Sequence, residues 1–366
     1  MTGDTNRSLP LWTAIFLILA ACAGTGKALQ GDPEIAGVSS RILSPEAEEL
    51  VRTGILYHDR GDYETALDYY RKALELAPDH PVVCYEMAFS YLYMGDSETA
   101  LQTAERGIAA AVDRDMGDLI PSLFDLKGSA LDNLGRSEEA VDVYLEAINK
   151  YGAADTFLYY NLGLTYYRIG KSGEALDALV QGLQINPNHS SSNYLLGRIC
   201  MEKGMKTQAF YSLLYLLLLE PNTDRAAESY NTILHMLAIQ EETIGFRNNG
   251  TFTPADIIIS LSFTLDEANA QKDASEKTAA KLYYIFTTLE DQKNAGKIGR
   301  SAGDELWWDF YSSFFYRIAK SDYFGTFSRY IGIASDPQAD EWIETGRDEI
   351  EGLFTWLNEY PGPEAE

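Results

Sequence analysis

The sequence has few residues of the kinds that build catalytic and metal sites. It contains three cysteines and four histidines in 366 residues. The histidines form no HExxH or other metal-binding spacing, and no CxxC, GxSxG or calcium-loop pattern occurs. We therefore expect no catalytic residue, no metal site and no cofactor, which means that the chain is not expected to be an enzyme.

Positive charge is scarce as well. With 29 lysines and arginines against 55 aspartates and glutamates, the formal net charge is −26. This charge repels phosphate backbones and anionic lipid headgroups, so nucleic acid is not expected as a partner. The excess is greatest at residues 336–366, which hold ten acids and one base, Arg347, and are expected to face water.

Long hydrophobic runs are absent after the first residues of the chain. The longest later candidate lies around Leu213–Leu219, which is far shorter than a membrane-spanning helix. Near the N-terminus, an apolar stretch from Leu9 to Ala21 follows a short polar start that contains Arg7. We interpret residues 1–21 as an export signal and do not expect a multi-pass membrane protein.

The end of this signal contains a cysteine in a suggestive setting. The residues Leu19–Cys22 read Leu-Ala-Ala-Cys and resemble the lipobox of bacterial lipoproteins. The resemblance implies that Cys22 is lipidated and anchors the protein, with residues 22–46 as a flexible tether. Because Ala23 is not aspartate, it also implies the outer membrane of the cell envelope, facing the periplasm. The alternatives are an ordinary signal peptide cleaved nearby and an uncleaved apolar anchor.

A repeat accounts for the next half of the chain. Five glycines are each followed, five residues later, by an alanine. The pairs are Gly61 and Ala66, Gly95 and Ala100, Gly135 and Ala140, Gly170 and Ala175, and Gly204 and Ala209. Successive glycines are 34, 40, 35 and 34 residues apart, and removing the insert 115–120 and Asp155 brings the middle two to 34. This pattern resembles the tetratricopeptide repeat.

The resemblance implies an all-α fold in which five helix-turn-helix repeats form a superhelix, followed by a helical C-terminal domain. The implied repeats are 47–80, 81–114, 121–154, 156–189 and 190–223, and a capping helix at 224–240 completes the array 47–240. Small residues at the eighth position of each repeat are expected to let its two helices approach closely; they are Gly54, Ala88, Gly128, Gly163 and Gly197.

In this family the first helices of the repeats line a groove that binds a protein or peptide. The groove positions that the resemblance implies here are Tyr85, Phe89, Tyr93, Phe157, Tyr160, Asn161, Leu164, Tyr167, Arg168, Tyr194, Arg198 and Met201. Tyrosine and arginine are enriched among residues that dominate binding energy. The alternative for any one of these tyrosines is that it packs against a neighbouring helix. The family's clamp for a terminal carboxylate is matched only at Asn161.

The remaining cysteines and two of the histidines occupy structural positions of the repeats. Cys84 and Cys200 fall at helix-packing positions and are expected to be buried thiols, too far apart for a disulfide. Cys22 is then the odd cysteine, which lipidation explains. His80 and His189 fall in turns between repeats, where we expect surface exposure.

The C-terminal region 241–366 carries no recognised motif. Helices are expected at 254–271, 275–294, 304–320 and 336–358, the first opening at Thr253-Pro254 as N-cap and first-turn proline. Four of the five tryptophans lie here, and the stretch 304–320 is so aromatic that we expect it to be covered on more than one side. A helical core explains these residues more simply than a ligand pocket does.

These observations lead to one main hypothesis and one alternative. The main hypothesis is an envelope lipoprotein that uses its repeat groove as a protein-binding scaffold or adaptor in the assembly of an envelope complex. The alternative is an envelope enzyme or small-ligand binder whose site lies in the C-terminal helical domain, with the repeats as a docking arm.

Overall fold

The computed structural model shows an all-α protein over the residues that it describes. These residues are 43–151, 155–238, 253–298, 304–336 and 338–359. They fall into two compact units, 43–187 and 188–359, which we treat separately. Within the described ranges, no helix combines the length and the apolar character that crossing a membrane requires.

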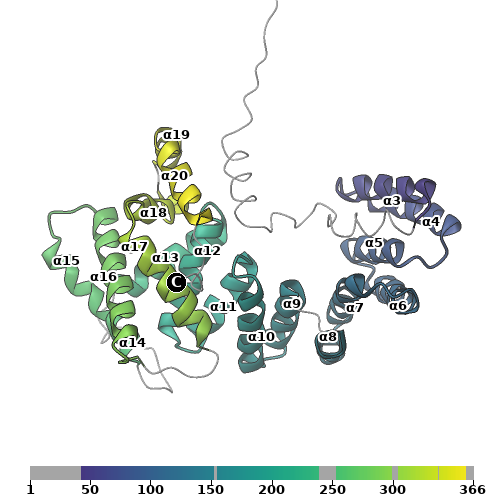
Figure 1. Ribbon diagram of the computed structural model, residues 1–366, viewed down its shortest axis with the longest axis horizontal. Helices are drawn as coiled ribbons and strands as arrows, with labels where there is room; N and C mark the ends of the chain where they lie inside the picture. The colour runs from purple at the N-terminus through teal and green to yellow at the C-terminus, as the bar shows by residue number, and fades with distance from the viewer. Residues whose placement is uncertain (1–42, 152–154, 239–252, 299–303, 337, 360–366) are drawn as a thin grey trace, which may run out of the picture. The chain divides into compact units, whose positions relative to one another are not determined.

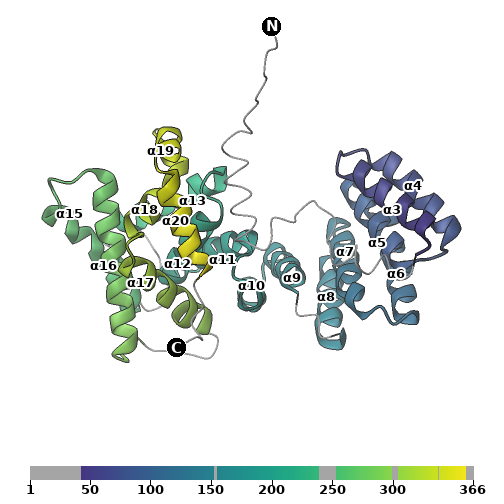
Figure 2. The ribbon, with the colours of Figure 1, turned by 45° about the horizontal axis from the view of Figure 1, so that its top comes forward.

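The first unit consists of four antiparallel helix pairs (Figures 1 and 2). The pairs are α3 (Pro45–His58) with α4 (Tyr63–Leu76), α5 (Pro81–Tyr93) with α6 (Ser97–Asp113), α7 (Ile120–Asn133) with α8 (Ser137–Tyr151), and α9 (Thr156–Arg168) with α10 (Ser172–Ile185). A short 3-10 turn, Gly117–Leu119, precedes α7. The first helices contact one another in sequence, α3 with α5, α5 with α7 and α7 with α9. The array of helix pairs expected from the repeat is therefore confirmed.

In each of the first two pairs, a glycine followed by an aspartate forms the turn between the two helices. Gly61 and Gly95 adopt φ values of 78° and 81°, a left-handed conformation that ends the first helix and that side chains disfavour. The next residue, Asp62 or Asp96, then begins the second helix, because its carboxylate accepts a hydrogen bond from a backbone N–H three residues on, at 3.2 Å. The sequence thus encodes each turn locally.

In the first and third pairs, the two helices approach so closely that the first helix has no room for a side chain at its eighth repeat position. A Cβ atom built on Gly54 would lie 2.3 Å from the ring of Tyr70, and one on Gly128 would lie 2.3 Å from the ring of Tyr144. Both tyrosines are fully buried. The expectation that small residues at the eighth position permit close approach is confirmed at these sites.

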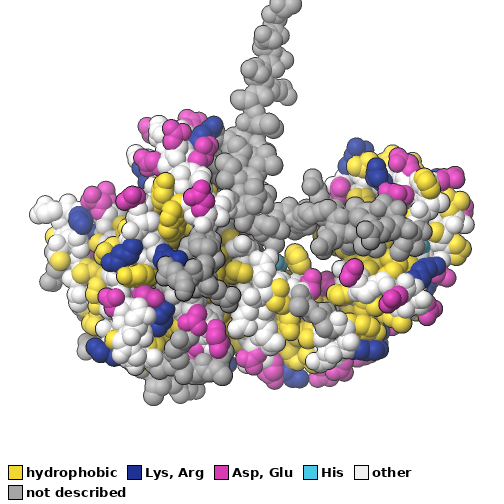
Figure 3. All heavy atoms as spheres, viewed as in Figure 1, with side chains coloured by type: hydrophobic (Ala, Val, Ile, Leu, Met, Phe, Trp, Pro, Cys, Tyr) yellow, Lys and Arg dark blue, Asp and Glu magenta, His cyan; other side chains and the backbone are white. Residues whose placement is uncertain are grey.

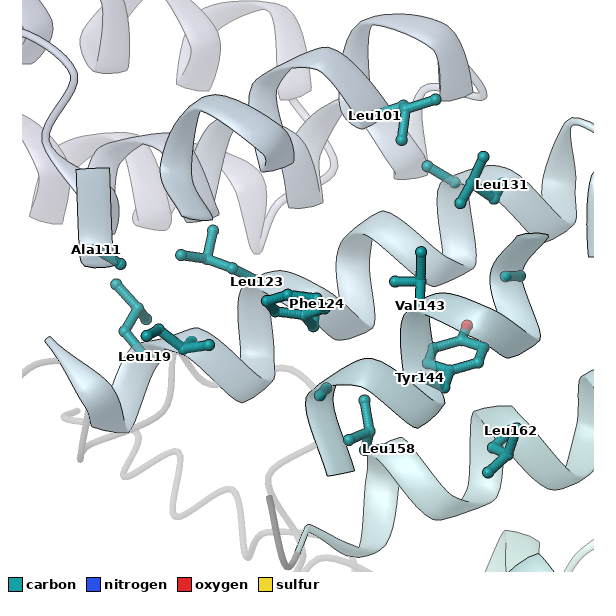
Figure 4. Close-up of a cluster of buried hydrophobic side chains, with 14 of the residues drawn as sticks. Leu101, Ala111, Leu119, Leu123, Phe124, Leu131, Val143, Tyr144, Leu158 and Leu162 are labelled. Carbon is teal, nitrogen blue, oxygen red and sulfur yellow. The ribbon is translucent and has the colours of Figure 1, made fainter. Parts of the chain in front are cut away.

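The core of the first unit runs continuously through neighbouring pairs. Leu101 of α6, Leu123 of α7, Tyr144 of α8 and Leu158 of α9 belong to one buried cluster (Figure 4). Because each pair contributes to the core of the next, the first helices are held in a fixed order, and their outward sides form one surface.

The two turn histidines are buried, contrary to the expectation of surface exposure. His80 is 3% exposed and His189 is 8% exposed. Each lies at the start of a first helix, where an arginine from further along the chain covers the turn. Arg114, for example, donates hydrogen bonds to the carbonyl oxygens of Pro78 and Asp79. Burial and the nearby arginine lower the pKa of each imidazole to about 4, so both are neutral.

The second unit begins with one more helix pair and continues into the C-terminal helices. Its elements are α11 (Ser190–Glu202), α12 (Lys206–Leu219), α13 (Asp224–Ala238), α14 (Pro254–Leu261), η3 (Ser262–Thr264), α15 (Leu265–Ala268), α16 (Ala274–Asn294), η4 (Leu306–Ser312), α17 (Ser313–Lys320), α18 (Phe324–Tyr330), η5 (Ile333–Ser335), α19 (Ala339–Thr345) and α20 (Arg347–Asn358). The expected helices at 224–240 and 275–294 correspond to α13 and α16.

Three of the expected C-terminal helices differ in detail. The predicted helix 254–271 is divided into α14, η3 and α15, although it begins as expected, with Thr253 as N-cap and Pro254 in the first turn. The predicted helix 304–320 is π-helical through η4 before it becomes α17. The predicted helix 336–358 breaks at Gly346, where a Cβ atom would lie 2.9 Å from the Trp342 indole nitrogen. The helix α18 was not expected.

Helix α12 is buried on nearly every side, which explains its unbroken apolar sequence. The Tyr211 ring of α12 stacks on Phe315 of α17 at 5.7 Å between centroids, and Phe286 of α16 stacks on Phe315 at 5.0 Å. Tyr311 of η4 donates a hydrogen bond to Asn193 of α11 at 2.5 Å. The aromatic C-terminal stretch is therefore core, covered on more than one side as expected.

The tight contact in the third pair predicts a strong effect of a single added methyl group. We expect Gly128→Ala to lower the free energy of unfolding of the first unit by about 1–3 kcal/mol, because the Tyr144 ring must move. The control is Gly173→Ala on α10, where nothing lies within 4 Å and alanine favours the helix.

Hydrogen exchange read by mass spectrometry over α7 and α8 measures this effect. Tryptophan fluorescence does not report on the first unit, because residues 43–187 contain no tryptophan. Equal protection of these helices in the two variants would contradict the steric explanation.

Candidate functional site

The residues predicted to line the groove divide between the two units. Nine of them lie on α5 and α9 in the first unit, and Tyr194, Arg198 and Met201 lie on α11 in the second. We use the name first-helix surface for the outward sides of α3, α5, α7 and α9. Its members discussed below are His58, Asp59, Tyr85, Glu86, Phe89, Tyr93, Asp125, Asp132, Phe157, Tyr160, Asn161, Leu164, Tyr167 and Arg168.

At the α3–α5 end, this surface is aromatic. The His58 imidazole stacks on Phe89 at 4.8 Å between centroids and meets the edge of Tyr93 at 5.3 Å. Phe89 also stacks on Tyr85 at 6.1 Å, and Tyr93 lies 5.7 Å from Tyr63 of α4. Tyr93 is 49% exposed, so the cluster presents ring surface to solvent.

His58 belongs to this cluster although the sequence analysis did not select it. It occupies the twelfth position of the first repeat, one of the groove positions, and that position is the signal that could have identified it. Its Nδ1 lies 2.7 Å from the Ser90 hydroxyl oxygen. Burial lowers its pKa, so the ring is neutral and packs as an aromatic side chain.

A buried carboxyl group lies on the same side of α5, one turn before Phe89. Glu86 is 4% exposed and forms no ion pair within the part of the chain that the structure describes. Burial, with a smaller contribution from Asp59, raises its pKa from 4.5 to about 8. The sequence analysis missed Glu86, which occupies the sixth position of the second repeat.

Toward α9, the first-helix surface becomes polar. The Asn161 amide donates a hydrogen bond to Asp125 Oδ1 at 2.7 Å, and about two turns later Arg168 pairs with Asp132. Both pairs join α7 to α9. Burial raises the pKa of Asp125 from 3.8 to about 7, partly offset by the hydrogen bond from Asn161. Asn161 and Arg168 therefore face neighbouring residues as well as solvent.

The remaining predicted residues of α9 leave apolar surface accessible. Phe157 is 44% exposed, and Tyr160, Leu164 and Tyr167 are partly exposed. Apolar and aromatic side chains that are ordered but accessible are the kind that contribute most to binding a polypeptide.

In the second unit, Tyr194 is engaged by its neighbours. Its hydroxyl donates a hydrogen bond to Glu228 of α13 at 2.9 Å. The guanidinium groups of Arg198 and Arg225 lie over its ring, at 5.7 and 5.6 Å from the centroid. Tyr194 therefore packs against a neighbouring helix, which is the alternative considered above for these tyrosines.

The other chemical groups considered in the sequence analysis are the cysteines and the possible metal ligands. Cys84 and Cys200 are free and buried, as predicted, and burial raises the pKa of the Cys84 thiol to about 11. Among the described residues, no group of three or more histidine, cysteine or acidic side chains could hold a metal ion. Cys22 lies outside the described residues.

The raised pKa of Glu86 predicts an unusual dependence of stability on pH. The folded state keeps a proton that the unfolded state releases above pH 4.5, so the free energy of unfolding falls as pH rises from about 4.5 to about 8. We expect Glu86→Gln to be more stable than the wild type above pH 8, by at most roughly 5 kcal/mol, and similar to it at pH 4.

Urea unfolding of the first unit, followed by hydrogen exchange over α5 at several pH values, checks this expectation. Glu64→Gln on the exposed side of α4 is the control, because it removes a solvated carboxylate. A wild type and a Glu86→Gln variant with parallel pH profiles would show that the carboxyl group is not desolvated.

Comparison with known proteins identifies the repeats. Models of the tetratricopeptide repeat match residues 47–80, 122–149 and 156–189. The TPR repeat-containing protein MJ1428 of Methanocaldococcus jannaschii is 23% identical over 182 residues, 42% of this chain and 32% of that protein. The small glutamine-rich tetratricopeptide repeat-containing protein 2 of Mycosarcoma maydis is 31% identical over 103 residues, 28% of each chain. The chain thus spans about a third or less of these relatives.

Solved structures resemble the helical array. TTC0263, a thermophilic TPR protein of Thermus thermophilus, has 20% identity and a TM-score of 0.43, covering 51% of this chain and 99% of its own. PilW, a type IV pilus biogenesis factor, has 16% identity and a TM-score of 0.41, covering 71% and 97%. Tetratricopeptide repeats are therefore recognised at three places in this chain, and they coincide with the first, third and fourth helix pairs of the first unit.

Proposed function

We propose that this protein is a membrane-anchored envelope lipoprotein that binds a protein partner through its first-helix surface and acts as a scaffold in the assembly of an envelope complex. Tetratricopeptide repeats are protein-interaction modules and bind protein or peptide partners. The observation that carries the proposal is the row of accessible aromatic side chains on α5 and α9.

The arrangement of these side chains suits a polypeptide ligand. The α3–α5 end offers stacked rings and the α7–α9 end offers hydrogen-bonded polar groups, so the surface varies in chemistry along its length. A partner segment laid across several helices meets both kinds of contact. Because the helices are held by a continuous core, the surface is preorganised, which reduces the entropy lost on binding.

The anchor in this proposal is a diacylated Cys22. The lipobox-like residues Leu19–Cys22 support it, as does the burial of Cys84 and Cys200, which gives the other two thiols a packing role. Lipid chains stabilise membrane attachment by about 0.8 kcal/mol for each buried methylene, without a spanning helix. The proposed location is the outer membrane, with the repeats facing the periplasm.

Two tyrosines of α9 test the binding surface. We expect the double variant Tyr160→Ala, Tyr167→Ala to lose one abundant envelope protein that the wild type captures, because accessible aromatic side chains dominate such contacts. The measurement is crosslinking in intact cells, followed by affinity purification and mass spectrometry. A folded state is first confirmed by circular dichroism.

The matched control is the double variant Leu76→Ala, Ile185→Ala. These side chains are 47% and 45% exposed and lie on second helices, away from the first-helix surface. Recovery of the same proteins from the wild type and both variants would place partner binding elsewhere in the chain.

The anchor is tested separately by Cys22→Ala. We expect this variant to leave the membrane fraction, because it lacks the thiol that carries the lipid. Mass spectrometry of the N-terminal peptide of the wild type should show the added acyl chains, and Cys84→Ala should remain in the membrane fraction. Unchanged membrane association of Cys22→Ala would refute the lipid anchor.

A further inference from the structure

The acidic groups of the first-helix surface are not all matched by cations. The first helices carry two arginines, and each is paired with an acid: Arg52 of α3 with Glu48 at 3.0 Å, and Arg168 of α9 with Asp132 of α7. Glu86 has no cationic partner within the described part of the chain, and neither has Asp125.

Glu86 is placed where water solvates it poorly, whereas Asp125 is partly exposed. Glu86 is only 4% exposed, and a carboxylate in such a place is unfavourable unless a cation or several hydrogen-bond donors approach it. Asp125 receives one donor, the Asn161 amide at 2.7 Å. The two carboxyl groups lie on α5 and α7, which pack directly against each other.

The surroundings of Glu86 favour a cationic side chain that also has apolar surface. Phe89 and Tyr93 follow Glu86 at three and seven residues along α5, so the three side chains lie on one side of the helix. An arginine or lysine that reached the carboxyl group would pass these rings. Such a side chain gains a charge-assisted hydrogen bond and a favourable contact with the ring faces.

We propose that the first-helix surface binds a polypeptide segment that carries arginine or lysine next to aromatic or aliphatic residues, with the basic side chains paired to Glu86 and Asp125. This inference rests on the proposed protein-binding function and specifies the chemistry of the partner. The segment supplies the cations that this surface lacks, and its apolar residues contact the rings around His58.

The charge of the whole chain supports a basic partner over the chain itself. Acidic side chains are spread over both units (Figure 3), and the net charge of −26 attracts a basic segment from a distance. A second copy of the protein carries the same net charge and is repelled. The C-terminal residues 336–366, with ten acids and one base, have the wrong sign to pair with these carboxyl groups.

The two carboxyl groups give this binding a pH signature. With pKa values of about 8 and about 7, Glu86 is mostly protonated and Asp125 about half protonated at pH 7, and a bound cation favours release of both protons. Affinity for a basic segment should therefore rise from pH 6 to pH 8.5. The titratable and polar groups near these carboxyls are Asp59, Tyr70, Tyr144, Asp155 and Asn161.

Fluorescence anisotropy with defined peptides tests the proposal on the full chain. The probes are labelled twelve-residue peptides with arginine and phenylalanine in varied order on a glycine-serine background, and control peptides have glutamine in place of arginine. The test variant is Glu86→Gln, Asp125→Asn. The matched control variant, Glu64→Gln, Glu75→Gln, removes two carboxyl groups from exposed positions of α4.

We expect the wild type to bind at least one arginine peptide and none of the glutamine peptides. The test variant should weaken that binding by about tenfold or more and abolish its pH dependence, since it lacks both titrating groups. The control variant should change the affinity by less than about twofold. Equal weakening in both variants would indicate general electrostatic attraction and overturn the proposal, as would unchanged binding by the test variant or no binding by the wild type.

Failure of this inference is distinguishable from failure of the proposed function. If the Tyr160→Ala, Tyr167→Ala variant loses a cellular partner while no arginine peptide binds, the surface is a protein-binding site whose partner has different chemistry. If arginine peptides bind as expected, sequencing the captured partner for a basic and apolar segment connects the two results.

Discussion

The first unit depends on the close approach of the two helices of each pair, which occurs at a glycine on α3, α7 and α9 and at Ala88 on α5. Where Gly54 meets Tyr70, and where Gly128 meets Tyr144, the ring fills the space that a side chain would occupy. This contact sets the distance and rotation of the helix pair. Once the rotation is set, the residues on the opposite side of each first helix form the first-helix surface, so the small residues at these contacts determine which side chains belong to it.

The protein buries polar groups that a stability optimum would exclude. A carboxyl group at Glu86 is buried beside aromatic rings, and two buried histidines, His80 and His189, hold no charge. The histidines are part of the packed turns between helix pairs, which accounts for their burial. Glu86 has no such structural partner, and unfavourable groups of this kind in natural proteins concentrate where function requires them.

The sequence predicted the parts of the fold that are encoded locally and periodically. The turn glycines and the small residues at the eighth position were enough to predict the helix pairs, because both act within one repeat. Burial of His80 was not predictable in this way, since the arginine that covers its turn, Arg114, lies 34 residues further on. Glu86 was missed because selection by residue type favoured aromatic groove positions, whereas its importance arises from burial, which only the packed structure reveals.

In the second unit, the C-terminal helices pack against the helix pair α11–α12. Helix α12 has the pattern of a second helix, but Tyr211 and its neighbours are enclosed by the C-terminal helices, and Asn193 of α11 bonds to Tyr311. On α11, the Tyr194 hydroxyl donates a hydrogen bond to Glu228, and the guanidinium groups of Arg198 and Arg225 lie over its ring. Tyr194 is partly exposed, as Tyr160 and Tyr167 of α9 are. We place the proposed partner on the first unit because Glu86 and Asp125 lie there without a cationic partner among the described residues.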